Sequence, residues 1–402
     1  MNGMPQSDYL ATLEPFERRW AWAQIDREAV RTNLKTMRKH IGPDTMILTV
    51  VKADAYGHGA VEVAKIAQSA GSKFIGVASV TEGIELRQAG IKAPIIILSE
   101  PPITSIEAIL YYDMVPAIHT LEFALALGEK AASLGVIAPF HLKVDSGMNR
   151  VGVHYTDAGD FLRTVSFHEG LDLEGTFTHF ATADSADSFA FKTQTDRFEH
   201  ALENIRYMGM DPGIVHAANS AAAIRYKRAH YDMVRLGISV YGLHPSPVTR
   251  ELIRLEPAMS IHARITALKQ VALGEGVSYG FTYRSPGGID IATIPIGYGD
   301  GLTRLLSNKM DVLVDGSRYP QVGTICMDMC MFEASMRADI SSVYKARLSS
   351  ERKQLEYGDE VIIVGRSGNQ EISLDDMATQ VGTINYELAC MFGRRLERVY
   401  VD

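Results

Sequence analysis

TMILTVVKADAYGHGA, residues 45–60, is the stretch that decides the fold of this chain. Its first half is an apolar run rich in β-branched residues, and its second half is a polar turn. A short apolar run bounded by a turn is typical of a strand that is buried on both faces. Lys52 follows the run directly, so its amine either reaches water at the strand end or stays desolvated. A desolvated amine is pushed toward the neutral, nucleophilic form that Schiff-base chemistry requires.

Seven further apolar runs follow, and all eight alternate with helix-like segments. The runs begin at Met46, Phe74, Ala93, Met114, Pro139, Leu173, Gly213 and Tyr231. The intervening segments, such as AVEVAKIAQSAG from Ala60, carry apolar residues at three- and four-residue spacing and end at a glycine. Alternation of this kind predicts right-handed βαβ units and a parallel sheet. Eight units in about two hundred residues favour a (β/α)8 TIM-type barrel, so we expect an α/β fold with its barrel over residues 22–255.

The pattern changes after residue 255. Strand-like segments separated by Gly, Pro and Asp replace the helical periodicity, as in IDIATIPIG from Ile289 and DEVIIVG from Asp359. We therefore predict a second, mainly β C-terminal domain over residues 256–402, with one helical pattern near Asp375–Met391. Residues 1–21 are expected to pack alongside, and the polar stretch Glu333–Tyr357 is predicted to be a surface insertion.

Composition narrows the class of protein. The chain has 402 residues, of which 46% are hydrophobic and 22% charged, as in ordinary soluble globular proteins. Its net charge of −8 and its lack of a Lys/Arg-rich run argue against a nucleic-acid surface. We see no signal peptide and no segment that could span a membrane. The cysteines are too few for a disulfide framework, and Cys326 and Cys330 lack a usual zinc spacing. We expect a cytoplasmic protein with free thiols and no metal site.

Polar residues gather where the predicted strands end, which is where a barrel of this kind places reactive groups. They are Lys52, Asp54, Tyr56, Lys143, Asp145, Arg150, His179, His216, Asn219, Ser220, Arg235 and Gly237. Any one of them could serve in a salt bridge at the rim. Together, the cations predict a cup that holds an anionic ligand.

The seventh and eighth strand ends carry features of a phosphate site. Asn219 and Ser220 lie where a strand meets a helix, so backbone N–H groups and a hydroxyl can face an anion. Gly237 allows the backbone to approach closely, and barrels often bind phosphate at these two loops. A phosphate site opposite a strand-end lysine suggests pyridoxal phosphate, with Lys52 as its Schiff-base partner.

An ordered series of motifs resembles the bacterial alanine racemases from about residue 22 to the C-terminus. The motifs are VVKADAYGHG, KVDSGMNRVG, THFATAD, HAANSAA, RLGISVYG, GVSYG, IGYGDG, VGTICMDM and INYELA. No single motif is specific, whereas the ordered set is. The resemblance implies a pyridoxal-phosphate enzyme that works as a homodimer with shared active sites.

The resemblance also implies the catalytic roles. Lys52 would form the internal aldimine and then act as the base on one face of the substrate α-carbon. Tyr279, supplied by the partner subunit, would act on the opposite face. Because an unperturbed tyrosine has a pKa of about 10, neighbouring cations would have to tune it. Arg235 would face the pyridine nitrogen and, since it keeps its proton, would leave the ring a weaker electron sink.

The remaining site residues are implied in the same way. His179 would orient Arg235. The phosphate would be bound by Tyr56, Ser220, Tyr386 and the backbone of Gly237 and Ile238. The substrate would be bound by Arg150, by Tyr298 and by the backbone of Met327 from the partner chain. Lys143 matches a position that is often carbamylated in the family, where the new anion orients Arg150.

The resemblance predicts interconversion of L- and D-alanine through an external aldimine by a two-base mechanism, which supplies D-alanine for peptidoglycan. A racemase of the same build that acts on serine or another amino acid is the nearest alternative. A pyridoxal-phosphate barrel decarboxylase is a second, although such enzymes usually place a carboxylate where Arg235 would lie. A non-enzymatic pyridoxal-phosphate carrier is a third, but it would have no use for the β domain.

Overall fold

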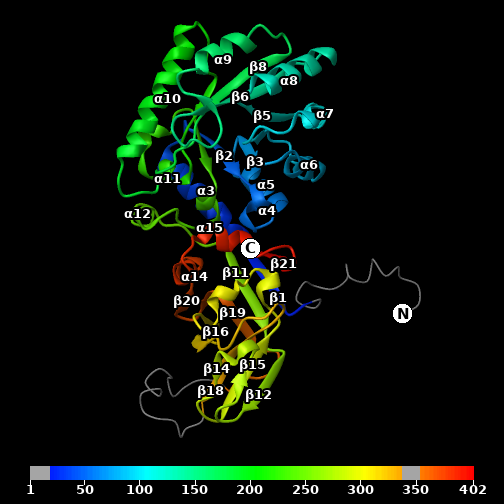
Figure 1. Cartoon of the computed structure of the whole chain (residues 1–402), viewed down its shortest axis with the longest axis vertical. Coiled ribbons are helices and arrows are strands. Elements are labelled where there is room, and N and C mark those ends of the chain that lie inside the picture. Colours follow the sequence, from blue (N-terminus) through cyan, green and yellow to red (C-terminus); the bar gives the residue numbers. More distant parts are fainter. Residues whose placement is uncertain (1–18, 337–353) are drawn as a thin grey trace, which may run out of the picture. The chain divides into compact units, whose positions relative to one another are not determined.

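The computed structural model describes residues 19–336 and 354–402. The chain forms two compact units, each with its own sheets (Figure 1). One unit comprises Arg27–Pro257, and the other joins the chain before Arg27 to the chain from Ala258 onward. The division thus falls at residues 26/27 and 257/258, whereas the sequence placed it at 21/22 and 255/256.

The first unit contains the predicted barrel. Each of the eight apolar runs holds one strand, and hydrogen-bonded neighbours follow the order β10-β2-β3-β4-β5-β6-β8-β9 with every pair parallel. The strands are β2 (Met46–Val50), β3 (Phe74–Val77), β4 (Ile95–Ile97), β5 (Met114–Ile118), β6 (Ala138–Asp145), β8 (Leu171–Phe177), β9 (Ile214–His216) and β10 (Met233–Leu236). Asp232 accepts a hydrogen bond from the Val215 backbone at 2.8 Å and donates one to it at 3.1 Å, which nearly closes the barrel between β9 and β10.

Helices surround these strands (Figure 1). They are α3 (Arg27–Ile41), α4 (Lys52–Tyr56), α5 (Ala60–Ser69), α6 (Val80–Gln88), α7 (Ile106–Tyr111), α8 (Leu121–Ser133), α9 (Ala158–Val165), α10 (Phe189–Tyr207), α11 (Ser220–Arg225) and α12 (Pro247–Arg250). The ends of the helices follow from local chemistry: Ser79 and Glu82 form a capping box that starts α6. The short strand β7 (Val153–His154) pairs with β6.

The second unit is mainly β. Its largest sheet has the order β17-β16-β19-β11-β1-β21, with β20 beside β19, and a second sheet has the order β12-β15-β18. The strands are β1 (Ala21–Asp26), β11 (Met259–Arg264), β12 (Ala267–Val271), β13 (Gly276–Val277), β14 (Tyr283–Arg284), β15 (Ile289–Ile294), β16 (Asp311–Val314), β17 (Ser317–Pro320), β18 (Cys330–Met336), β19 (Glu360–Ser367), β20 (Gln370–Ile372) and β21 (Glu397–Val401).

Strand β1 explains the shifted boundary. It pairs antiparallel with β11 and parallel with β21, so the residues from Trp22 to Asp26 belong to the β unit and not to the barrel. Their partners lie more than two hundred residues away along the chain. The apolar pattern of AWAQID predicts a strand but cannot name the sheet that it joins.

Two other details differ from the sequence-based expectation. Glu333 is 4% exposed on β18 and accepts a hydrogen bond from the Tyr283 hydroxyl at 2.7 Å, so the predicted insertion does not begin there. Residues 337–353 of that insertion, like residues 1–18, lie outside the described residues. The single late helical pattern is two helices, α14 (Leu374–Val381) and α15 (Asn385–Met391).

The described part of the chain bears on the thiols, on metal-binding groups and on membrane-spanning helices. All three cysteines are free thiols. Within residues 19–336 and 354–402, no group of three or more His, Cys, Asp or Glu side chains is arranged to hold a metal ion. None of the helices described there is both long and apolar enough to cross a bilayer.

One buried side chain joins α3 to the end of the barrel chain. The Asn33 amide donates to the backbone oxygens of Val240 at 3.1 Å and Glu256 at 2.8 Å, and its oxygen accepts from the Glu256 N–H at 2.8 Å. Asn33 is fully buried. Its removal would leave these backbone groups without partners in a dry environment.

We predict that Asn33→Ala lowers the free energy of unfolding of this chain by about 3 kcal/mol, because an orphaned buried polar group costs about 1–3 kcal/mol. Equilibrium unfolding in urea measures the change. Lys35→Ala on the same helix is the control: within the described residues Lys35 forms an ion pair with the exposed Glu28, and its loss should cost under about 0.5 kcal/mol. Equal losses in both variants would contradict this role of Asn33.

Candidate active site

A left-handed turn follows strand β2. Residues Ala53–Tyr56 have φ between 51° and 54°, a conformation that costs an L-residue about 1–2 kcal/mol each. Two carboxylates hold the turn: Glu82 of α6 accepts from the Ala53 N–H at 2.8 Å, and Asp54, within the turn, accepts from the Ala60 N–H at 2.8 Å. Strain that is held by surrounding contacts is typical of functional sites.

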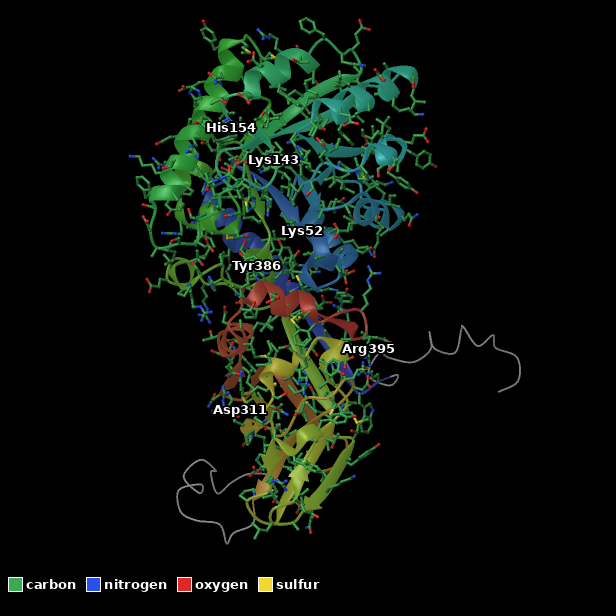
Figure 2. All side chains as sticks on the ribbon, viewed as in Figure 1. Lys52, Lys143, His154, Asp311, Tyr386 and Arg395 are labelled. Atoms are coloured by element: carbon green, nitrogen blue, oxygen red, sulfur yellow. The ribbon has the colours of Figure 1, made fainter. Side chains whose placement is uncertain are left out.

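The turn places Lys52 and Tyr56, the residues at its two ends, at the mouth of the barrel. Lys52, partly buried, begins the turn at the carboxyl end of β2 (Figure 2). At the other end, the Tyr56 hydroxyl lies 2.8 Å from the point where a Cβ on Gly237 would stand. The Tyr56 ring also packs against Tyr241, with 5.1 Å between centroids. The segments that follow β2 and β10 therefore meet, and a side chain at Gly237 would displace the Tyr56 hydroxyl.

Several hydrogen-bond donors lie close together beside the contact between Tyr56 and Gly237. The Ser220 hydroxyl oxygen accepts from the Gly237 N–H at 3.0 Å, from the Ser239 N–H at 3.4 Å and from the Ser239 hydroxyl at 3.0 Å. Ile238 is the first residue of a 3-10 helix, so its N–H has no partner within that helix. Together with the Tyr56 hydroxyl, these groups can coordinate the oxygens of a phosphate.

Arg235 is buried, with 3% of its surface exposed, and five hydrogen bonds hold its side chain. Its two terminal nitrogens contact the ring nitrogens of His179 at 3.1 Å and His216 at 3.2 Å, and the backbone oxygens of Thr178, His216 and Ala217 at 2.8–3.1 Å. Every acceptor is neutral. Burial, together with the nearby Arg150, lowers the pKa of Arg235 to about 9, so the guanidinium stays charged at neutral pH. Its Nε has no acceptor among the residues that the structure describes, so it is the donor left for a ligand.

Two more cations lie near Arg235 without a carboxylate in hydrogen-bond contact. Lys143, on β6, is 4% exposed, and its Nζ lies 4.5 Å from the centroid of the Phe177 ring (Figure 2). Burial, then Arg235 and Arg150, place the pKa of Lys143 well below its usual value. Arg150 is exposed and makes no hydrogen bond or ion pair within the described chain. The site therefore attracts anions, and burial shifts Lys143 toward its neutral amine form.

The other predicted residues lie in the β unit. Tyr279, Tyr298 and Met327 are close to one another: Thr324 donates to the Tyr279 backbone oxygen at 2.8 Å, and the Tyr298 N–H donates to the oxygen of Cys326 at 3.0 Å. Their exposed fractions are 70%, 43% and 51%. Tyr386 lies on α15, apart from this group in sequence and half-buried.

Sequence reasoning missed residues that line the barrel interior. His141 and Glu174 are linked to Arg235 through His216, and Phe177 stacks on the His216 ring. A signal was present for His141: it precedes Lys143 by two positions, so both side chains leave the strand on the same face. Glu174 carried no such signal.

Sequence profiles of known families match both units. Residues 25–245 match the profile "Alanine racemase, N-terminal domain", and residues 258–400 match "Alanine racemase, C-terminal domain". The chain belongs to the alanine racemase family. A curated relative from Nostoc sp., named alanine racemase, is 41% identical over 95% of this chain and 96% of its own length.

Solved structures of this family share the fold. The alanine racemase of Clostridium difficile 630 superposes with a TM-score of 0.87 at 37% identity, covering 95% of each chain. The alanine racemase from Bacillus anthracis, solved with bound L-Ala-P, gives 0.86 at 36% identity over 96% of this chain and 95% of that one. A histidine racemase from Leuconostoc mesenteroides gives 0.84 at 28% identity over 96% and 98%. Members of similar structure thus carry different substrate names.

We predict that Ala53→Val destabilises the chain by about 1 kcal/mol or more, because a β-branched residue tolerates the left-handed region poorly. Ala53→Gly is the matched control and should be at least as stable as the natural chain. Ala53 is exposed, so packing does not confound the comparison. Urea midpoints that are equal for valine and glycine would show that the turn is not under strain.

Proposed function

We propose that this alanine racemase family member is a pyridoxal-phosphate-dependent enzyme that interconverts L- and D-alanine as a cytoplasmic homodimer, with each active site shared between two chains. Production of D-alanine for peptidoglycan would be its use. The observation that carries the proposal is the surrounding of Arg235. At the mouth that also holds Lys52, it has only neutral acceptors and one donor left over.

The residues at the barrel mouth fit pyridoxal phosphate. The Tyr56 and Ser220 hydroxyls and the backbone at Gly237 and Ile238 supply donors for the phosphate, and Tyr386 is proposed to add another. When bound, pyridoxal phosphate supplies an electron sink that acidifies the α-carbon of an amino acid. The donor set matches the charge of the phosphate without any metal ion.

Arg235 controls how strong that sink is. A guanidinium does not transfer its proton to a ring nitrogen, so a ring that faces Arg235 Nε accepts less charge. A weaker sink disfavours transamination and decarboxylation, which need a long-lived carbanion. Arg235 therefore favours racemisation over the decarboxylase alternative, whose usual carboxylate it replaces.

Two groups would move the proton. Lys52 is proposed to hold the α-proton on one face and Tyr279, from a second copy of the chain, on the other. Arg150, which has no ionic partner in the described chain, is available for the substrate carboxylate. The exposed cluster of Tyr279, Tyr298 and Met327 supports a surface that a second copy covers, since large apolar side chains are seldom grouped in water.

Lys143 is suited to carbamylation. Burial lowers the pKa of Lys143, which favours the neutral amine. A neutral amine can add to carbon dioxide, forming an N–C bond and releasing one proton, and the product is an anion. That anion would sit near two arginines that otherwise lack a carboxylate partner, and we propose that it orients Arg150.

The identity of the amino-acid substrate is a separate point from the type of reaction. The similarity to a histidine racemase keeps another amino acid as the second candidate. Alanine is preferred because both family profiles and the curated Nostoc relative carry that name. The carrier alternative gives no role to the exposed Tyr279 cluster.

We predict that the purified chain binds pyridoxal phosphate and that borohydride attaches it to Lys52, as read by peptide mass spectrometry. Lys52→Ala should lower the racemisation rate by about a thousandfold or more, because it removes both the attachment point and a base. Lys73→Ala, at an exposed lysine elsewhere in the barrel, should leave labelling and rate unchanged. Attachment at a different lysine would rule out the assignment.

We predict that Tyr279→Phe separates the two faces of the reaction. Net racemisation must slow equally in both directions, because the enantiomers have equal free energy. Hydrogen exchange at the α-carbon in D2O is more specific: D-alanine should still exchange through Lys52, while exchange of L-alanine falls by about a hundredfold or more. Tyr207→Phe, at a tyrosine 92% exposed, is the control. Equal exchange losses for both enantiomers would contradict the two-base scheme.

A further inference from the structure

A polar column runs inside one part of the barrel, over the neighbouring strands β8, β6, β9 and β10, where branched apolar residues normally pack. It begins at Glu174 on β8, whose side chain is 29% exposed, and ends at Arg235 on β10. His141 Nε2 lies 3.0 Å from Glu174 Oε2, and His141 Nδ1 lies 2.8 Å from His216 Nε2. His216 Nδ1 lies 3.2 Å from an Arg235 nitrogen, and both histidines are fully buried.

The two ends of the column fix the direction of every hydrogen bond. Arg235 can only donate, so His216 Nδ1 must be a lone pair and the proton of His216 must lie on Nε2. That proton points at His141 Nδ1, which must also be a lone pair. The remaining His141 proton, on Nε2, is then donated to Glu174, which accepts as a carboxylate. Burial lowers the pKa of both imidazoles, which keeps them in this neutral form.

The surrounding residues are shaped to hold the column. A Cβ on Gly175 would stand 2.5–2.6 Å from two atoms of the His141 ring, so only glycine leaves space for that ring. Phe177 stacks on His216 with 4.7 Å between centroids and a 6° angle between planes. A buried polar chain is costly unless each member is satisfied, and here each contact has one donor and one acceptor.

We propose that Glu174, His141 and His216 are positioning residues that set the direction and the charge environment of Arg235 from the strands β8, β6 and β9. The carboxylate locks the tautomer of His141, which locks that of His216, which presents a lone pair to the guanidinium. Arg235 then keeps Nε for the ligand, and the negative charge at the far end offsets its positive charge. The catalytic consequence rests on the proposed function of Arg235, whereas the proton arrangement does not.

Histidine NMR on the natural chain with its cofactor bound tests the proton arrangement directly. In long-range 1H–15N spectra of 15N-histidine-labelled protein, His141 and His216 should both be neutral with the proton on Nε2. Single substitutions of each histidine assign the signals. A proton on Nδ1 of His216, or a doubly protonated ring, would overturn the proposal without any assay of activity.

Glu174→Lys tests the control of Arg235. A lysine can only donate, so it forces the opposite tautomers and turns a His216 N–H toward Arg235. We expect both rings to show protons on Nδ1, and kcat to fall by about tenfold or more while KM for alanine stays within about twofold. Glu174→Gln, which can still accept, should lie near the natural rate.

Asp172→Lys is the matched control, because it makes the same charge change at an exposed position on the same strand. Natural tautomers and an unchanged rate are expected there. Equal effects of Glu174→Lys and Asp172→Lys would overturn the proposal. If the lysine variant does not fold, the spectra of the natural chain and of Glu174→Gln decide. Expected tautomers in a protein that racemises nothing would count against the proposed function alone.

Discussion

The left-handed turn after β2 is the constraint on which the rest of the site depends. It reverses the chain within four residues, so that Lys52 and the Tyr56 hydroxyl both stay at the barrel mouth. A regular helix starting at the same residue would carry Tyr56 away from Gly237. The turn persists because Glu82 binds the Ala53 N–H from outside, while Asp54 of the turn binds the N–H of Ala60 at the start of α5. The surrounding fold thus keeps the turn residues in a strained, left-handed conformation.

The barrel mouth, where the turn places Lys52, is also rich in positively charged side chains. The mouth holds an excess of positive charge that the described chain does not neutralise: Arg150 has no ionic partner, and Arg235 has only neutral acceptors. Such a site is stable only if its cations are well hydrogen-bonded, made neutral, or matched by anions from outside. Arg235 is well hydrogen-bonded, and burial lowers the pKa of Lys143, which favours its neutral form. The phosphate of a cofactor, a substrate carboxylate and a carbamate are the anions that complete the third.

Sequence predicted the barrel because its strands are local features. Each apolar run is complete within a few residues, and its terminal polar residue needs no knowledge of the partner strand. Strand β1 could not be assigned in this way, since its partners lie at the far end of the chain. The start of the predicted insertion failed for a related reason. Glu333 reads as a surface residue until the Tyr283 hydroxyl, fifty positions away, is placed beside it.

In the candidate site, too, local features could be predicted from the sequence, whereas contacts between distant residues could not. Lys52 and Ser220 come after strands and Arg235 lies near the end of one, so their grouping was predictable. The contacts of Arg235 with His216 and of His216 with His141 depend on the radius of the barrel. Left-handed backbone at Ala53–Tyr56 was also hidden, because neither alanine nor tyrosine prefers it. Resemblance supplied the roles of Tyr279 and Met327, and the structure adds that they are exposed together in one unit.

The central claim is that one chain contributes Lys52 and another contributes Tyr279 to the same site. Co-expression of the Lys52→Ala and Tyr279→Phe chains with different affinity tags, followed by purification on both tags, isolates the mixed dimer. Only one of its two sites keeps both bases, so the account predicts about half the natural racemisation rate, although each variant alone is nearly inactive. A mixed dimer no more active than either parent would contradict the shared site.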